Sequence, residues 1–94
     1  MAELLPVDTS SASSADFTIA AGGSAIVALK NATGSSIALG ASVDIELKIG
    51  SLYFFVYTMT RSSPARIIQG DALAATTWRV TRAATGVPSG VQQL

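Results

Sequence analysis

The sequence contains no cysteine and no histidine. The absence of cysteine excludes disulfides, thiol nucleophiles and thiolate metal sites. The absence of histidine removes the side chain that most often binds transition metals and acts as a general base near neutral pH. The 94 residues form a single small domain, and a domain of this size hides only about 60–65% of its unfolded surface. Because neither disulfides nor histidine-bound metals can support it, we expect additional stability from partner subunits.

Charged residues are also scarce, with six lysines and arginines balanced by six aspartates and glutamates. The chain lacks the clustered positive charge that is typical of nucleic-acid-binding domains, so we expect no nucleic acid partner. It also lacks a run of about 18 apolar residues, the length that predicts a transmembrane helix, so we expect no membrane partner. Residues 1–7 have no basic start and too short an apolar stretch for a secretory signal. These absences predict a protein that is made and kept in a cytoplasm.

Strict alternation of apolar and polar residues is the main structural pattern that the sequence does contain. It is clearest at residues 42–49, where Val43, Ile45, Leu47 and Ile49 alternate with Asp44, Glu46 and Lys48. Gly50-Ser51 then connects this segment to the apolar residues 52–59, which predicts an antiparallel hairpin. With the shorter alternating segments elsewhere, the pattern predicts about seven strands in an all-β, jelly-roll-like antiparallel β-sandwich with less than about 10% helix.

The predicted core and a second apolar face follow from the same alternation. We expect the core to contain Val43, Ile45, Leu47, Phe54, Val56, Trp78 and Val80. The period of two then places Tyr53, Phe55, Tyr57 and Met59 on the opposite face of their strand. Three kinds of partner could cover that face: another segment of the same chain, a second subunit, since aromatic residues are enriched at interfaces, or a sugar that stacks on the rings.

Residues 1–14 are predicted to form a flexible arm, and residues 15–94 the β-sandwich domain. The serine-rich residues 8–14 have no apolar periodicity, and such a composition cannot order itself. Leu4, Leu5 and Val7 precede this tether. The segment is either a frayed end or an anchor, and we expect the three apolar side chains to dock on a neighbouring subunit or capsid.

Asp44 and Glu46 form the one pair of carboxylates with a spacing that acid–base catalysis could use. They lie on one face of a predicted strand together with Lys48, which is also the pattern of an ordinary solvated face. We favour the second interpretation, because no apolar neighbour on that face would raise a carboxyl pKa. The sequence therefore predicts a protein that is not an enzyme and has no catalytic, cofactor or metal site.

Four phrases of the sequence resemble those of small virion proteins of tailed bacteriophages. They are DFTIAAG at 16–22, VDIELK at 43–48, PARIIQG at 64–70 and TWRVTR at 77–82, and a Gly-Val pair follows at 86–87 or 90–91. The similarity covers about residues 15–92. The family pattern has a Pro-Gly before the closing strand, whereas residues 71–75 occupy that place here, so this loop is expected to differ.

The resemblance implies a structural protein of the virion, made in the host cytoplasm, that decorates or cements the capsid surface. It implies that the chain forms a homotrimer with two further copies of itself, and that it also binds the major capsid protein or another virion protein. The alternative is a carbohydrate- or receptor-binding module of a phage tail or fibre. The residues expected at the interface, from the patterns above, are Leu4, Leu5, Val7, Tyr53, Phe55, Tyr57 and Met59.

Overall fold

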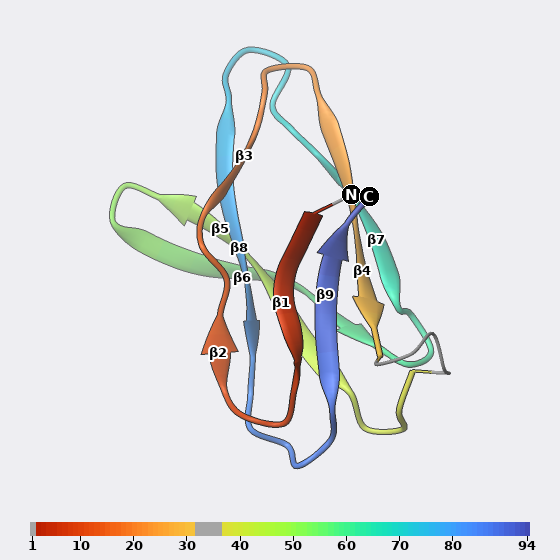
Figure 1. The fold of residues 1–94 in the computed structure, drawn as a ribbon. Helices are drawn as coiled ribbons and strands as arrows, with labels where there is room; N and C mark the ends of the chain where they lie inside the picture. Colours follow the sequence, from red (N-terminus) through yellow and green to blue (C-terminus); the bar gives the residue numbers. More distant parts are fainter. Residues whose placement is uncertain (1, 32–36) are drawn as a thin grey trace.

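The computed structural model describes residues 2–31 and 37–94 (Figure 1). The described part contains nine strands and no helix, which confirms the all-β prediction. The strands are β1 (Ala2–Asp8), β2 (Ala12–Ser13), β3 (Phe17–Ile19), β4 (Ser24–Lys30), β5 (Ser42–Ile49), β6 (Leu52–Thr60), β7 (Ala65–Gln69), β8 (Thr76–Arg82) and β9 (Ser89–Gln93).

The strands form two antiparallel sheets that pack as a jelly roll. One sheet has the order β1-β9-β4-β7. In the other, β2 and β3 both pair with β8, which is followed by β5 and β6. The pairs β1–β9, β2/β3–β8, β4–β7 and β5–β6 are nested, as if one long hairpin with its tip at residues 50–51 had been rolled into two sheets. This topology confirms the predicted jelly-roll-like sandwich.

The core lies between the two sheets and is built from alternate residues of their strands. Val43, Ile45, Trp78 and Val80 are buried as predicted, and Leu47 is partly buried against them. Ile45 pairs with Val80 across β5 and β8. The remaining buried apolar residues are Leu5, Ile19, Ala25, Val27, Leu29, Ala41, Met59, Ile68 and Val91. The alternation in the sequence therefore locates the centre of the core correctly.

The flexible N-terminal arm is not confirmed, because residues 2–8 form strand β1 at the edge of the first sheet. Leu5 pairs with Val91 of β9 and is only 3% exposed, within the core of its own domain. Leu4 packs partly buried against that core, and Val7 is half-buried. The apolar end of the segment finds a partner strand in the same chain, so these residues do not need a neighbouring subunit to cover them.

A β-bulge in β6 overturns the predicted alternation of the second apolar face. Ile45 pairs with Tyr57 and Glu46 pairs with Phe55, which leaves Val56 without a partner in the ladder. One extra residue moves the following side chains to the other face of the sheet. Tyr57 therefore packs against the core rather than on the outer face.

Three assignments are corrected here, those of Met59 and Val56 by the bulge. Met59, expected on the outer face, is fully buried opposite Val43. Phe54 and Val56, expected in the core, are 47% and 49% exposed. Phe54 does share the inner face with Leu47, its partner across the hairpin. It stays exposed because this end of the hairpin extends beyond the sheet that would cover it (Figure 1).

Arg82 is the last residue of β8 and points into the sandwich on the same face as Trp78 and Val80. Its exposure is only 2%. The guanidinium donates hydrogen bonds to three backbone carbonyl oxygens, at 2.7 Å to Pro6, 2.6 Å to Ser10 and 2.6 Å to Ser89. These acceptors belong to β1, the following turn and β9. The arginine thus links the two sheets to each other at one end of the sandwich.

Candidate functional site

Several exposed apolar side chains lie on the β5–β6 hairpin, which projects from the body of the sandwich (Figure 1). We define the hairpin surface as Ile49, Leu52, Phe54 and Val56, which are 59%, 63%, 47% and 49% exposed. Ile49 pairs with Leu52, and Phe54 pairs with Leu47 on the same face. An apolar surface of this kind on a small domain is typical of an interaction site.

The hairpin surface continues into a cavity between the two strand edges β6 and β7. The cavity has a volume of about 210 Å³. Val56 and Ile67 line its mouth, and the buried side chains of Ile45, Ile68 and Trp78 line its base. Arg66 also lines it and stacks on the ring of Tyr57, with 3.8 Å between the guanidinium carbon and the ring centre. The side of the sandwich is therefore open to the core at this point.

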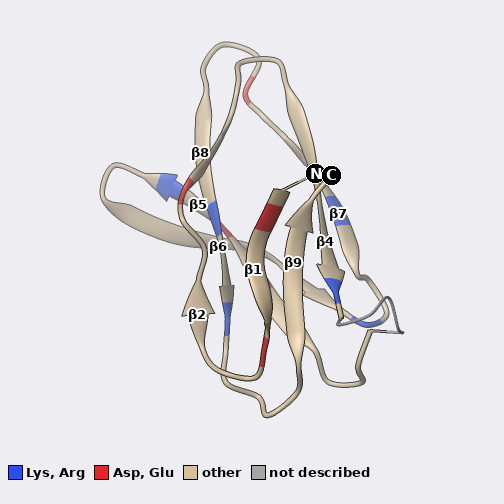
Figure 2. Ribbon diagram, viewed as in Figure 1, with Lys and Arg blue, Asp and Glu red and all other residues tan. Residues whose placement is uncertain are grey.

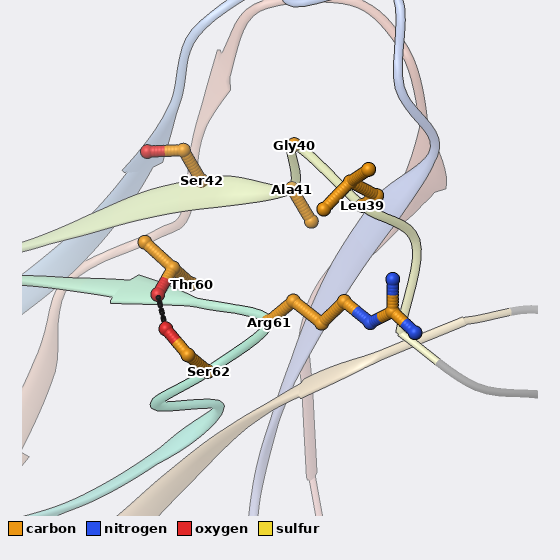
Figure 3. Close-up of a pocket in the computed structure, with 7 residues that line it drawn as sticks. All are labelled: Leu39, Gly40, Ala41, Ser42, Thr60, Arg61 and Ser62. Carbon is orange, nitrogen blue, oxygen red and sulfur yellow. Dashed lines mark hydrogen bonds between the residues drawn. The ribbon is translucent and has the colours of Figure 1, made fainter.

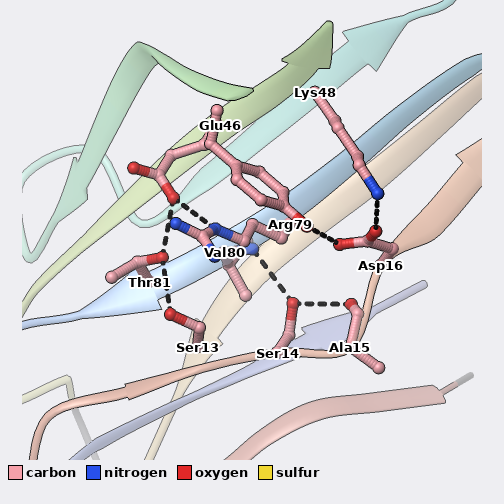
Figure 4. Close-up of polar contacts among 10 residues, drawn as sticks. Ser13, Ser14, Ala15, Asp16, Glu46, Lys48, Arg79, Val80 and Thr81 are labelled. Carbon is pink, nitrogen blue, oxygen red and sulfur yellow. Dashed lines mark hydrogen bonds and ion pairs between the residues drawn. The ribbon is translucent and has the colours of Figure 1, made fainter. Parts of the chain in front are cut away.

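The outer face of the same hairpin is polar and its groups are paired with one another (Figure 4). Asp16 accepts hydrogen bonds from the Tyr53 hydroxyl at 2.8 Å and from the Lys48 ammonium at 3.0 Å. The Arg79 guanidinium lies 3.5 Å from the centre of the Tyr53 ring. Hydrogen bonds from Tyr53 and Lys48 lower the pKa of Asp16, and Asp16 in turn raises the pKa of Lys48. These interactions fix Tyr53 against its own sheet.

The carboxylates considered for catalysis belong to the same polar face. Glu46 accepts hydrogen bonds from Arg79 at 2.7 Å and from Thr81 at 2.8 Å, and Asp44 accepts one from Thr58 at 2.7 Å. Burial acts to raise the pKa of Glu46, but the bonds from Arg79 and Thr81 outweigh it and the net pKa is lowered. A general acid needs a raised pKa, so the arrangement favours a structural role for this pair.

These lowered pKa values predict a loss of stability in acid. A carboxylate whose pKa is lower in the folded than in the unfolded state stabilises the fold above its unfolded pKa, and this contribution disappears as the pH falls. The ordinary values are 3.8 for Asp16 and 4.5 for Glu46. We expect urea unfolding to show falling stability below about pH 4.5, and little change between about pH 5.5 and 8, where no ordinary side-chain pKa lies without histidine.

The variant Glu46→Gln should make this acid dependence shallower. The matched control is Asp71→Asn in the loop between β7 and β8, an exposed carboxyl outside the network. If the free energy of unfolding of Glu46→Gln fell as steeply below about pH 4.5 as that of the wild type, this carboxylate would not be a source of the acid sensitivity.

A second hollow lies at the opposite end of β5 and β6, with a volume of about 520 Å³ (Figure 3). Residues 39–42 and 60–62 line it, and Arg61 supplies the one charged side chain. The hydroxyls of Thr60 and Ser62 bond to each other at 3.2 Å. The hollow therefore offers no pair of groups for acid–base or nucleophilic chemistry.

The structure does not bring the predicted interface residues together on one surface. Phe55 is 62% exposed and Tyr53 half-buried on the polar outer face, whereas Tyr57 and Met59 belong to the inner face. Leu5 is in the core. Ile49, Leu52 and Ile67 are exposed apolar residues that the sequence pattern did not predict. Alternation alone could not identify them, because it shows which residues share a face but not where that face ends.

Charged residues are few and spread over both sheets (Figure 2). Within residues 2–31 and 37–94, no cluster of three or more acidic residues could hold a metal ion, and no helix is long and apolar enough to cross a membrane. Comparisons with protein-family models, curated proteins and solved structures find no match to the chain. Among the described residues, the hairpin surface is thus the strongest candidate for a functional site.

Proposed function

We propose that the protein is a non-enzymatic structural protein of a bacteriophage virion. It decorates or cements the capsid surface, and the hairpin surface is its docking surface. The observation that carries the proposal is the uncovered apolar end of the β5–β6 hairpin, with side chains 47–63% exposed. Fully burying an exposed Val, Leu, Ile or Phe side chain contributes about 1.5–3 kcal/mol, and these four are already about half covered, so covering the rest would supply about 3–6 kcal/mol toward the contact.

The paired polar groups support a structural role over a catalytic one. Glu46, Asp44 and Asp16 all accept hydrogen bonds from neighbouring side chains of the same sheet. The Glu46 carboxyl has a lowered pKa, which suits an ion pair and not a proton donor. The face that carries most of the polar chemistry is therefore engaged within the protein, while the face that carries the apolar residues is free.

The context of a virion is supported by resemblance and by fold-level analogy. The phrases at 16–22, 43–48, 64–70 and 77–82 resemble tailed-phage virion proteins. Jelly rolls occur in viral capsid proteins, but they also occur in lectins and cupins, so the fold alone does not decide the function. The homotrimer and the contact with the major capsid protein or another virion protein belong to this proposal.

A carbohydrate-binding role has less support from the positions of the tyrosine rings. Sugars stack on exposed aromatic faces, and here Arg79 covers one face of Tyr53 and Arg66 covers one face of Tyr57. The hydroxyl groups of the two tyrosines bond to Asp16 and Ser63. The rings therefore stabilise the domain itself, and we favour the docking role.

The proposal is tested on purified particles of the phage whose genome encodes the chain. We expect mass spectrometry to detect the protein at constant copy number in gradient-purified particles, and immunogold labelling to place it on the head. Particles that lack the protein should bind purified wild-type chain, whereas Leu52→Asp should abolish binding because it puts a charge into an apolar contact.

The matched control is Leu73→Asp, since Leu73 is 92% exposed in the loop after β7 and lies outside the hairpin surface. This variant should bind as the wild type does. Absence of the protein from particles would overturn the proposal. Particle binding by Leu52→Asp at the wild-type level would overturn the role of the hairpin surface.

A further inference from the structure

Strand β6 is the longest edge strand of the described sheets, and a single β-bulge is its one protection against pairing with another chain. Edge strands are normally kept apart by charge, proline, bulges or short length. β1 carries Glu3, Pro6, Asp8 and two irregularities, β7 has five residues including Arg66, and β2 and β3 have two and three residues. The nine residues of β6 include no charged residue, proline or glycine, and have only the bulge at Val56.

The free edge of β6 adjoins the exposed side chains of the hairpin surface. Its own Leu52, Phe54 and Val56 contribute to that surface, and the cavity beside Val56 opens to the core. With exposed fractions of 47–63%, the four residues present about 400 Å² of apolar surface per copy. Two copies would bury about 800 Å² of it, the size of a weak interface. The free edge of β6 thus combines unpaired backbone groups with exposed apolar side chains.

We propose that a second copy of this chain covers the hairpin surface, with the two β6 strands paired antiparallel about a two-fold axis. The inference rests on the proposed function, which makes the hairpin surface a docking surface. It names a second copy as the first partner, and it gives this contact two-fold symmetry in place of the homotrimer that the resemblance implies. An antiparallel pair of identical edges is self-complementary and closes with two copies. Leu52, Phe54 and Val56 of one copy then meet the same three residues of the other.

Charge favours a second copy over an oppositely charged partner. β6 carries no charge, and the chain has a formal net charge of zero. Two copies therefore approach without the repulsion that keeps strongly charged proteins apart. Arg66, at the rim of the cavity, is held over the Tyr57 ring. Nothing on the hairpin surface selects an acidic or basic partner.

The exposed apolar run of β6 extends from Leu52 to Val56, so a pairing that covers it is centred on Phe54. Phe54 then lies beside Phe54 of the second copy, and Leu52 lies opposite Val56. Residues that face each other in antiparallel strands have Cα atoms about 4.5–5.5 Å apart, within the range that a disulfide spans. Because the chain contains no cysteine, one introduced cysteine reports on this position alone.

The test combines cross-linking with mass measurement on the purified full chain. We expect sedimentation at about 10–100 µM to give twice the 9.6 kDa of one chain, and Phe54→Cys to form a disulfide-linked dimer under mild oxidation. The control Leu73→Cys, at a more exposed position, should cross-link far less. Leu52→Asp should raise the dimer Kd at least about 10-fold, and Leu73→Asp should not.

The outcomes separate this inference from the proposed function. A monomer or a trimer at these concentrations, or equal cross-linking of the two cysteine variants, would overturn the two-fold pairing. If the chain did not form the two-fold dimer but still needed Leu52 to bind particles, the hairpin surface would dock on another virion protein. The proposed function would then stand. A dimer that is absent from particles would support the pairing and overturn the proposed function.

Discussion

Replacing Arg82 by methionine is expected to lower the free energy of unfolding by about 3 kcal/mol or more. Methionine fills a similar volume but donates no hydrogen bond, so the carbonyl oxygens of Pro6, Ser10 and Ser89 lose the donor that satisfies them. The acceptor in Ser89 is buried, and leaving it without a partner costs about 1–3 kcal/mol, whereas Pro6 and Ser10 are exposed residues, where each lost bond costs about 0.5–1.5 kcal/mol. For a domain of this size the melting temperature should fall by about 10–25 °C.

An opposing effect makes the result informative. Removing a buried charge relieves its desolvation, and whole buried ion pairs can be replaced by apolar residues without loss. Here only one side of the interaction can be removed, because the acceptors are backbone atoms that stay in place. We therefore expect the loss of hydrogen bonds to dominate.

Arg61→Met is the matched control, since Arg61 is exposed in the turn after β6. It should change the free energy of unfolding by no more than about 0.5 kcal/mol. The loss of free energy of unfolding in Arg82→Lys should lie between those of Arg82→Met and Arg61→Met. The lysine ammonium keeps the charge but lacks the planar guanidinium group that reaches several acceptors. Equal stability of Arg82→Met and wild type would show that the three bonds make no net contribution.

The burial of Arg82 illustrates what a sequence can and cannot predict. The period of two places Arg82 on the same face as Trp78 and Val80, so its inward direction was available from the pattern. Its partners were not, since the acceptors in β1 and the following turn lie 76 and 72 residues away in the chain. Every residue has a carbonyl group, so no residue type marks those positions. Only the folded topology brings them together.

The jelly roll itself was predictable because two kinds of signal agree. Alternation marks the strands, and glycines mark the turns between them: Gly22 and Gly50 have φ of 74° and 64°, which side chains other than glycine rarely adopt. The N-terminal segment was predicted to be a flexible arm because its serines suggest disorder. Residues 9–11 instead form the turn between β1 and β2, and Pro6 is tolerated because β1 is an edge strand.

The site was less predictable than the fold for a reason that lies in β6. All nine of its residues are compatible with a strand, and no glycine or proline marks the bulge at Val56. Two registers therefore fit the sequence equally well, and they differ in which side chains face the core. Packing of Met59 against the opposite sheet selects between them. The exposed end of the hairpin then follows from where that sheet stops.

Met59→Ala is accordingly expected to be strongly destabilising, whereas Phe55→Ala is not. Met59 is fully buried opposite Val43, and removing a methionine side chain from a core costs about 2–5 kcal/mol. Phe55 is 62% exposed on the outer face. Because little of its area is buried, truncation should change the free energy of unfolding by about 0.5 kcal/mol. Urea unfolding of both variants, with equal m-values, measures the difference.

The pair forms its own control, because a strand without a bulge would place residues 55 and 59 on the same face. Such a strand predicts similar losses for both substitutions, or a larger loss for phenylalanine, which has the larger apolar side chain. The bulge at Val56 predicts a difference of at least about 1.5 kcal/mol in the opposite direction. Equal losses would therefore contradict the bulge at Val56, and with it the placement of Tyr57 and Met59 on the inner face.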